Sequence, residues 1–91
     1  MYALVTGASS GIGLQYATVL AEKYKKDLVL VSNQEKELQE VAKDIEAKYG
    51  VKVVTLYKDL STETAPQEVY DFCKENNLEI EILINNAGVF Y

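Results

Sequence analysis

The sequence contains no histidine and no tryptophan, and it has one cysteine, one proline and one methionine among its 91 residues. Without histidine, this chain cannot supply a Ser-His-Asp triad, a histidine general base or a histidine metal ligand. The single cysteine, Cys73, cannot form an internal disulfide, which predicts a reducing compartment and a cytoplasmic location. We interpret Cys73 as a small core residue, because no basic partner is evident that would make it a nucleophile. No cluster of cysteines or carboxylates has metal-site spacing, so no metal ion is expected.

Basic residues are also few: 9 Lys and Arg stand against 14 Asp and Glu, which gives a formal net charge of −5. Nucleic acids and acidic membrane surfaces are bound through a basic face, so neither is expected as a partner. No apolar run is long enough to span a bilayer, and the start of the chain lacks the charged region of a signal peptide. With 48% hydrophobic and 25% charged residues, the chain is expected to form one small globular domain.

What the sequence does contain is a regular alternation of apolar runs and helical patterns. In the clearest helix, apolar residues fall on one stripe at i, i+3, i+4, i+7 and i+11, and Gly50 follows as the terminating residue. Tyr16 and Tyr24 in an earlier helix also fall on core-facing positions, and we interpret them as packing residues. The stripe of the clearest helix consists of Leu38, Val41, Ala42, Ile45 and Tyr49.

Seven elements follow from these patterns, in the order βαβαβαβ. Ser32 with Glu35, or alternatively Asn33, has the spacing to cap the second helix. The helices are expected at Gly11–Tyr24, from the cap at Ser32 or Asn33 to Tyr49, and from about Thr64. The strands are expected at Tyr2–Thr6, Asp27–Ser32, Val51–Tyr57 and Ile80–Asn85.

Strands that alternate with helices predict a parallel sheet with right-handed crossovers. The first three strands lead outward, and the chain must then cross back to the other side of the first strand. The predicted order is therefore 3-2-1-4, which is part of a Rossmann-like, doubly wound α/β fold. A flavodoxin-like order is the alternative, and it carries function at the ends of strands one and three.

A glycine-rich turn joins the first strand to the first helix, and this context is typical of a phosphate-binding loop. Gly7 permits the tight turn, Gly11 lets the backbone approach a pyrophosphate, and Gly13 lets the helix pack closely on the strand. The exposed N–H groups of the helix then face the negative phosphates. The alternative is a structural strand–helix turn, which has no need of three glycines.

Two motifs, one at each end of the chain, resemble the signatures of the short-chain dehydrogenase/reductase family. Thr-Gly-x-x-x-Gly-Ile-Gly, beginning at Thr6, resembles the family's cofactor signature, and Asn85-Asn86-Ala87-Gly88 is similar to its second signature. The resemblance covers the whole chain. It implies that Asp59 and Leu60 hold the adenine ring, that Asn86 ties strand four to its neighbours, and that Asn86 with Ala87 and Gly88 lines the adenosine and ribose side. The predicted cofactor-binding residues are Thr6, Gly7, Ser9, Ser10, Gly11, Ile12, Gly13, Ser32, Asn33, Asp59, Leu60, Asn86, Ala87 and Gly88.

The residues after the second strand favour NADP over NAD as the cofactor. An acidic residue about twenty positions beyond the glycine turn would bind the ribose 2′-hydroxyl of NAD, but Ser32 and Asn33 stand there. Both side chains can donate hydrogen bonds to a 2′-phosphate. The arginine that many NADP-dependent members carry is missing, and Lys36 is the candidate to replace it.

The string Tyr70-Asp71-Phe72-Cys73-Lys74 matches the family's catalytic Tyr-x-x-x-Lys pattern but stands in the wrong place. In the family that pair follows the Asn-Asn-Ala-Gly motif, whereas here it precedes the fourth strand. Tyr70 and Lys74 are therefore interpreted as an ordinary i, i+4 pair on a helix flank.

The resemblance implies that residues 1–91 are the N-terminal part of a single dinucleotide-binding domain of an oxidoreductase. Such an enzyme transfers hydride between a nicotinamide and a carbonyl or alcohol substrate. The family's catalytic serine and its tyrosine–lysine pair lie beyond the second signature, so the chain is expected to contain no catalytic residue and to be inactive by itself. The alternative is a complete, non-catalytic nucleotide-binding or interaction module.

The fourth strand is expected to form an open edge of the sheet. Ile80, Ile82, Leu83 and Ile84 make it apolar, and such an edge invites pairing with another chain. We therefore expect self-association through this strand or a homo-oligomer of the full-length protein.

Overall fold

The computed structural model describes residues 1–9 and 11–86. The expected seven elements are all present in the expected order. The third strand and the second and third helices begin slightly later than predicted, and the other predicted bounds agree. The elements are β1 (Tyr2–Thr6), α1 (Gly11–Tyr24), β2 (Asp27–Ser32), α2 (Glu35–Tyr49), β3 (Val53–Tyr57), α3 (Ala65–Glu75) and β4 (Ile80–Asn85).

The late start of β3 has a local cause. The backbone N–H of Lys52 donates to the side chain of Asp27 at 2.9 Å, so this amide is satisfied outside the sheet ladder. The ladder between β2 and β3 then begins one residue later, where Leu28 pairs with Val53.

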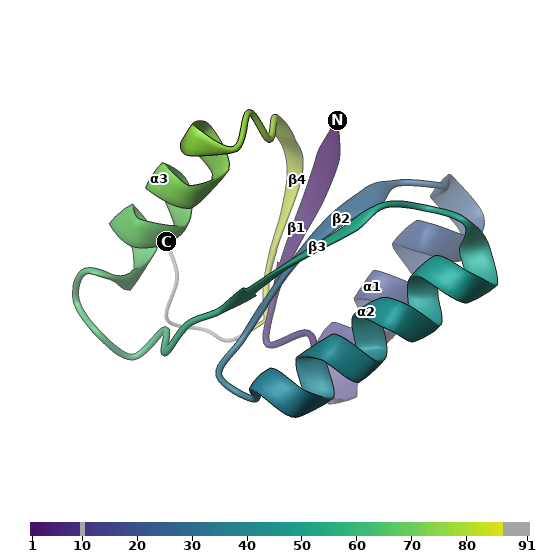
Figure 1. Ribbon diagram of the computed structural model, residues 1–91, viewed down its shortest axis with the longest axis horizontal. Coiled ribbons are helices and arrows are strands. Elements are labelled where there is room, and N and C mark those ends of the chain that lie inside the picture. Colours follow the sequence, from purple (N-terminus) through teal and green to yellow (C-terminus); the bar gives the residue numbers. More distant parts are fainter. Residues whose placement is uncertain (10, 87–91) are drawn as a thin grey trace.

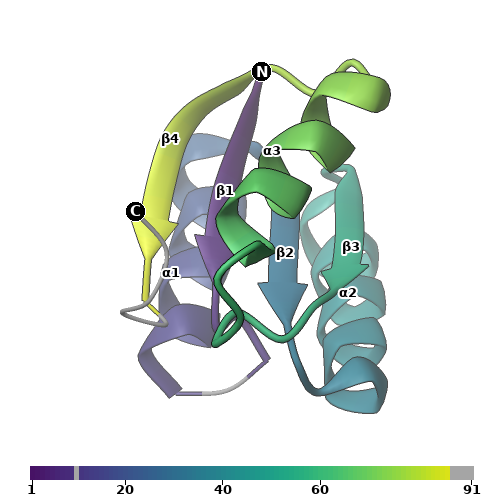
Figure 2. The same ribbon diagram turned by 90° about the vertical axis from the view of Figure 1, so that its left-hand side faces the viewer.

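All strands are parallel, and their order is β3-β2-β1-β4, which confirms the predicted 3-2-1-4 topology (Figure 2). Within the described residues the flavodoxin-like alternative is wrong, because β1 lies between β2 and β4. The carboxyl ends of the strands therefore meet at one edge of the sheet, where the loops after β1, β2 and β3 lie close together. The order also places the end of β4 beside the glycine turn, although the two are far apart in sequence.

Helices cover both faces of this sheet (Figures 1 and 2). Helices α1 and α2 lie together on one face, and α3 lies on the other. Two apolar clusters result, one on each side of the sheet. Strand residues such as Val5 and Leu30 belong to the first cluster, and Val29 and Val31 belong to the second, as expected for strands that are buried on both faces.

Helix α2 follows its sequence pattern closely. Leu38, Ala42 and Ile45 are buried against the sheet, and the helix ends at Gly50 in the left-handed region at φ 71°. The N–H of Gly50 donates to the carbonyl of Glu46 at 3.0 Å, as in a helix C-cap. The proposed caps at its start are wrong: Gln34 is the N-cap residue, and no side chain caps the helix there.

Helix α1 departs from its pattern. Tyr16 is 47% exposed and Tyr24 is 63% exposed, so their interpretation as packing residues is wrong. The helix instead contacts the sheet through small residues, and their small volume lets the helix axis lie close to β1. The bulky residues are consequently displaced to the flank. The buried residues of α1 are Gly13, Ala17, Leu20 and Ala21.

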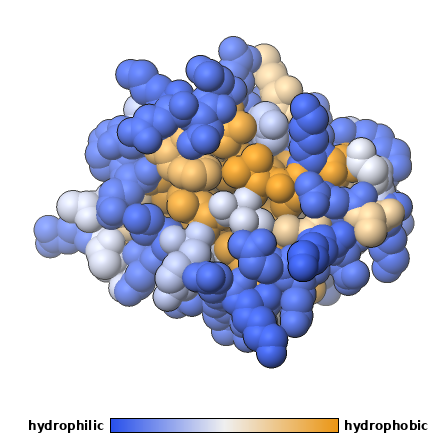
Figure 3. Space-filling model, viewed as in Figure 1, coloured by the Kyte–Doolittle hydropathy of each residue, from blue (hydrophilic) through white to orange (hydrophobic). Residues whose placement is uncertain are grey.

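Partly buried apolar residues also reach the surface near the sheet. In the space-filling view, apolar side chains gather at the centre of the visible face, where the sheet lies between the helices, and hydrophilic residues surround them (Figure 3). Val53, Val54 and Leu56 of the edge strand β3 are partly buried residues of this kind. None of the helices in the described residues has the length and apolar character needed to cross a membrane.

Candidate cofactor-binding site

The turn between β1 and α1 depends on two glycines in the left-handed backbone region. Gly7 has φ 63° and Gly11 has φ 61°, a region that L side chains rarely adopt. A Cβ at Gly11 would meet no atom within 4 Å, so the space beside this backbone is open. The backbone at Gly11 is therefore accessible to a ligand at the start of α1, where the first N–H groups of the helix lack intrahelical partners.

Gly13 has a different role, because it allows a close approach of two backbone segments. A Cβ at Gly13 would lie 2.1 Å from the carbonyl oxygen of Gly7 and 2.8 Å from Nδ2 of Asn86. Neither a methyl group nor a larger side chain fits there. The prediction that Gly13 permits tight packing of the helix on the strand is confirmed. The atom closest to Gly13 in this contact is the carbonyl oxygen of Gly7, in the same turn.

Hydrogen bonds from both neighbouring strands hold the turn in place. Asn86 Nδ2 donates to the Gly7 carbonyl at 3.4 Å, and the N–H of Ala8 donates to the Val31 carbonyl at 3.4 Å. The Thr6 hydroxyl donates to the Ile84 carbonyl at 3.4 Å. The glycine turn is therefore fixed between the ends of β2 and β4, and the implied role of Asn86 in tying β4 to its neighbours matches its contact with Gly7.

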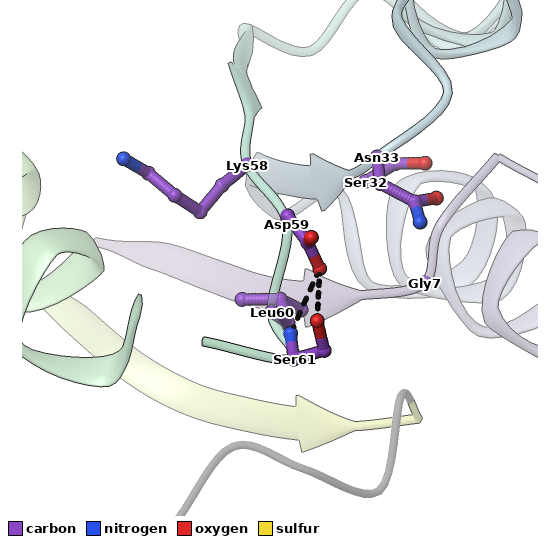
Figure 4. Close-up of a pocket in the computed structure, with 7 residues that line it drawn as sticks. All are labelled: Gly7, Ser32, Asn33, Lys58, Asp59, Leu60 and Ser61. Carbon is purple, nitrogen blue, oxygen red and sulfur yellow. Dashed lines mark hydrogen bonds between the residues drawn. The ribbon is translucent and has the colours of Figure 1, made fainter. Parts of the chain in front are cut away.

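A cavity of about 240 Å³ opens at the carboxyl edge of the sheet, beside this turn. Figure 4 shows that its walls come from the ends of β1, β2 and β3. Five predicted cofactor-binding residues line it together with two that sequence reasoning did not select, Lys58 and Ser61. The lining residues are Gly7, Ser32, Asn33, Lys58, Asp59, Leu60 and Ser61.

Asp59 is held in a fixed orientation at the wall of this cavity. Its Oδ1 accepts hydrogen bonds from the Ser61 hydroxyl at 2.6 Å and from the Ser61 N–H at 3.0 Å (Figure 4). These bonds, the hydroxyl first, hold the pKa of the Asp59 carboxyl below its ordinary value, so the group is ionised at neutral pH. The neighbouring Leu60 is 7% exposed and packs into the α3-side core, which anchors the loop.

The lysine at the cavity wall is already paired. Lys58 Nζ contacts Glu68 Oε2 at 2.9 Å, and its side chain extends away from Ser32 and Asn33 (Figure 4). This hydrogen bond and a second one from Thr64 hold the pKa of Glu68 below its ordinary value. Lys36, the proposed substitute for an arginine, is an exposed residue in the first turn of α2 and is not among the residues that line the cavity.

A group of hydrogen bonds links the glycine turn to the start of α2. Ser9 Oγ lies 2.9 Å from Ser32 Oγ and donates to Gln34 Oε1 at 2.6 Å. The backbone N–H of Gln34 donates to Ser32 Oγ at 3.1 Å. Gln34 was not selected from the sequence, and its position two residues after a serine at a strand end is the signal that indicates such a turn.

Most of the predicted binding residues therefore meet at one edge of the sheet. Ser10, Ala87 and Gly88 lie outside the described residues. Ile12 lies in the first turn of α1 with its side chain 60% exposed, and it does not line the cavity. Among the residues described, no group of three His, Cys, Asp or Glu side chains could hold a metal ion.

The Tyr70–Lys74 string lies on a different side of the molecule. Helix α3 covers the sheet face opposite to α1, and Tyr70 on it is 58% exposed. Lys74 lies beside Leu78 and Glu79, which precede β4 at the amino edge of the sheet. Burial of the neighbouring Cys73 raises the pKa of its thiol, which favours the unreactive protonated form.

Helices on both faces of a parallel sheet, with a three-glycine turn at its carboxyl edge, define a dinucleotide-binding domain of the Rossmann type. The sequence model of the short chain dehydrogenase family matches residues 1–90. The chain belongs to that family.

Individual relatives agree in fold and in sequence. The chain is 38% identical over 86 residues to the NADP-dependent 3-hydroxy acid dehydrogenase of Schizosaccharomyces pombe, covering 94% of this chain and 33% of that protein. It is 38% identical over 92 residues to the very-long-chain 3-oxoacyl-CoA reductase of Rattus norvegicus, covering 99% of this chain and 28% of that protein. The chain therefore spans about a third of these relatives or less.

A solved structure shows the same similarity in three dimensions. The L-sorbose reductase of Gluconobacter frateurii, complexed with NADPH and L-sorbose, matches with a TM-score of 0.88 and 36% identity. The match covers 96% of this chain and 33% of that chain. The family's cofactor-binding portion is thus the part of the fold to which this chain corresponds.

Replacing Gly13 with alanine is expected to destabilise the protein by about 1–3 kcal/mol, the usual cost of overpacking a close contact. Alanine favours a helix over glycine by about 1 kcal/mol, but the backbone carbonyl of Gly7 cannot move away as a flexible side chain would. Urea unfolding measures the loss. Gln15→Ala, at an exposed position of the same helix, is the control, and an equal effect of both variants would refute the close contact.

Replacing Tyr70 with phenylalanine is expected to leave dinucleotide affinity unchanged, because Tyr70 is an exposed residue of α3, which covers the sheet face opposite to α1. Titration calorimetry with NADPH measures the affinity. A loss of tenfold or more would mean that this Tyr-x-x-x-Lys string contributes to the cofactor site after all.

Proposed function

We propose that the chain binds the adenosine and pyrophosphate portion of NADP within an oxidoreductase. The proposed reaction transfers a hydride between the nicotinamide and a carbonyl or alcohol substrate. The observation that carries the proposal is the glycine turn, in which Gly7 and Gly11 adopt left-handed backbone and Gly13 contacts the Gly7 carbonyl. The family's activities and the NADPH complex of the similar L-sorbose reductase support the cofactor class. No feature of the described residues favours a complete non-catalytic module instead.

The pyrophosphate would lie against the start of α1. The unpaired N–H groups of the first helical turn and the positive end of the helix dipole both favour an anion there. The open space at Gly11 lets the phosphate oxygens come within hydrogen-bond distance of backbone N–H groups. Binding of this kind depends on the backbone, so it tolerates the exposed side chain of Ile12.

The adenosine would occupy the cavity at the ends of β2 and β3. Leu60 contributes an apolar contact for the adenine ring, and Asp59 Oδ1 is occupied by Ser61. The second carboxylate oxygen of Asp59 has no partner among the described residues, and it can accept a hydrogen bond from the exocyclic amine of adenine. Ser32 and Asn33 lie on the opposite wall, where the ribose 2′ position would fall.

The preference for NADP over NAD is part of the proposal. Residues 32–34 include no carboxylate, so the position at which an acidic residue would select NAD carries no negative charge against a 2′-phosphate. One similar protein is an NADP-dependent dehydrogenase by name, and the similar reductase structure contains NADPH. Both observations favour the phosphorylated cofactor.

The open edge of β4 is proposed to pair with a further strand, either from the same polypeptide or from a second copy. β4 pairs with β1 on one side, and Leu83 is 47% exposed. Glu81 forms an ion pair with Lys26 at 2.5 Å, so its charge gives the edge little protection against pairing. The relatives extend well beyond the matched portion, which provides a source for such a strand.

A reducing compartment such as the cytoplasm is the proposed location, because the one cysteine is buried and free. Localisation of the tagged protein by microscopy tests this directly, and secretion would refute it.

Replacing Ser32 with aspartate is expected to weaken NADPH binding at least about tenfold relative to NADH. The new carboxylate would lie next to the 2′-phosphate, and two like charges in contact repel by roughly 1–4 kcal/mol. Titration calorimetry with both cofactors gives the ratio. Asn77→Asp, in the turn between α3 and β4, is the control for net charge. If the ratio is unchanged, the 2′ position lies elsewhere.

Hydrogen exchange is expected to show whether the outer edge of β4 is paired. Alternate amides of a strand point to opposite neighbours, so an open edge exchanges quickly at every second residue and a paired edge exchanges slowly throughout. The other edge strand, β3, serves as the internal control. Sedimentation over a concentration series then distinguishes the two sources of the pairing strand. Pairing with a second copy depends on protein concentration, whereas pairing with a strand of the same polypeptide does not. Fast alternating exchange in β4 at all concentrations would refute the pairing.

A further inference from the structure

The backbone of β3 directs one set of polar groups into the sheet and a second set away from it. The Lys52 carbonyl accepts a hydrogen bond from β2 at 2.9 Å, and the Lys58 N–H donates one to β2 at 2.9 Å. Backbone groups of successive strand residues point to opposite sides, so the even-numbered residues face β2. The N–H and carbonyl groups of Val53, Thr55 and Tyr57 therefore point outward from this edge strand.

Glu46 on α2 occupies one of the outward groups. Its Oε2 accepts a hydrogen bond from the Val53 N–H at 3.1 Å. The backbone N–H and carbonyl groups of Thr55 and Tyr57, by contrast, have no outward partner among residues 1–9 and 11–86. The part of the edge that is free for complete pairing is thus limited to these two residues, which carry two donors and two acceptors.

The rest of β3 has the character of a strand that pairs. Edge strands are usually protected by charges, by proline or by bulges. Val53–Tyr57 reads Val-Val-Thr-Leu-Tyr, without a charge or a proline, and it pairs with β2 in continuous register. Val54 and Leu56 are only partly buried, and apolar side chains gather on the face where β3 lies between the helices (Figure 3). Tyr57 is 57% exposed at the end of the strand.

We propose that β3 pairs in antiparallel orientation with β3 of a second copy of this chain. When Thr55 of each copy faces Tyr57 of the other, every free backbone group of both residues finds its complement, in four hydrogen bonds. The two-fold axis then passes between the two Leu56 residues. A pair centred on Thr55 would instead place the Tyr57 carbonyl opposite the Val53 N–H that Glu46 holds. The bond from Glu46 therefore selects the register. It also favours a second copy over an unrelated extended peptide, because a copy stops pairing at the same residue.

The side chains agree with this register. Gln39 on α2 donates to the Thr55 hydroxyl at 3.0 Å, so Thr55 and Tyr57 both lie on the α2 face. There each tyrosine faces the threonine of the other copy, and such aromatic and β-branched pairs stabilise sheets. On the α3 face the two Leu56 side chains meet. The contact is small, so the dimer is weak and depends on protein concentration, and it requires no cofactor.

Replacing Tyr57 with lysine is expected to raise the dissociation constant of the dimer about tenfold or more, because it removes both aromatic pairs and places like charges on either side of the two-fold axis. Sedimentation equilibrium over a concentration series measures this constant. Tyr70→Lys is the matched control, because Tyr70 on α3 is 58% exposed and the substitution adds the same charge. A wild-type protein that stays monomeric, or equal constants for the two variants, would overturn the inference.

Disulfide cross-linking tests the register. Facing residues of a non-hydrogen-bonded antiparallel pair have Cα atoms about 4.5 Å apart, which is within the range of a disulfide. Leu56→Cys is therefore expected to give a covalent dimer under mild oxidation, measured by non-reducing electrophoresis. Val54→Cys, on the same face, is the control, because the two copies of this residue would lie roughly 14 Å apart. Wild type controls for Cys73, which is buried. Equal cross-linking of both variants, or none of either, would contradict the register.

Hydrogen exchange separates this pairing from pairing at β4. In dilute protein the outer edge of β3 is open, so the N–H groups of Thr55 and Tyr57 are expected to exchange quickly, and their exchange should slow as the dimer forms. The Val53 N–H, which Glu46 holds, should exchange slowly at every concentration. If the protein dimerises while the Thr55 and Tyr57 rates stay constant, association occurs through another surface and the inference fails.

Discussion

The contact between Gly13 and the Gly7 carbonyl is the constraint on which the site depends. A Cβ at Gly13 would lie 2.1 Å from that oxygen, so α1 can start where it does because the position has no side chain. The same carbonyl accepts a hydrogen bond from Asn86 at 3.4 Å, which connects the turn to the end of β4. One backbone oxygen thus joins the first strand, the first helix and the last described strand, and the candidate cofactor site lies around it.

The sheet order places the remaining candidate binding groups beside this junction. Because β1 lies between β2 and β4, the loops after β1, β2 and β3 open at the same edge. The cavity there has an apolar contact at Leu60, a fixed carboxylate at Asp59 and hydrogen-bonding residues at the end of β2. In the proposed site, an acidic chain would bind an anion through backbone N–H groups and a helix dipole, without a cluster of basic side chains.

Much of the fold could be predicted because its patterns are local. The stripe on α2, the apolar strand runs and the terminating Gly50 each express a preference of a few neighbouring residues. Helix α1 shows where this fails, since Tyr16 and Tyr24 satisfy a helical stripe and yet lie at the surface. The close approach of α1 to β1 selects small residues for the interface, and that distance is a property of the packed structure.

The sequence by itself determined the order of elements, the parallel topology and the family, because glycine spacing and alternating patterns are carried by the residues themselves. The tertiary structure decided which polar groups meet. Ser9, Ser32 and Gln34 are joined by hydrogen bonds because β2 lies beside β1, and Lys58 at the cavity wall is paired with Glu68 on α3. Such pairings depend on distances between separate elements and on how many donors each group has left. No local pattern encodes those quantities.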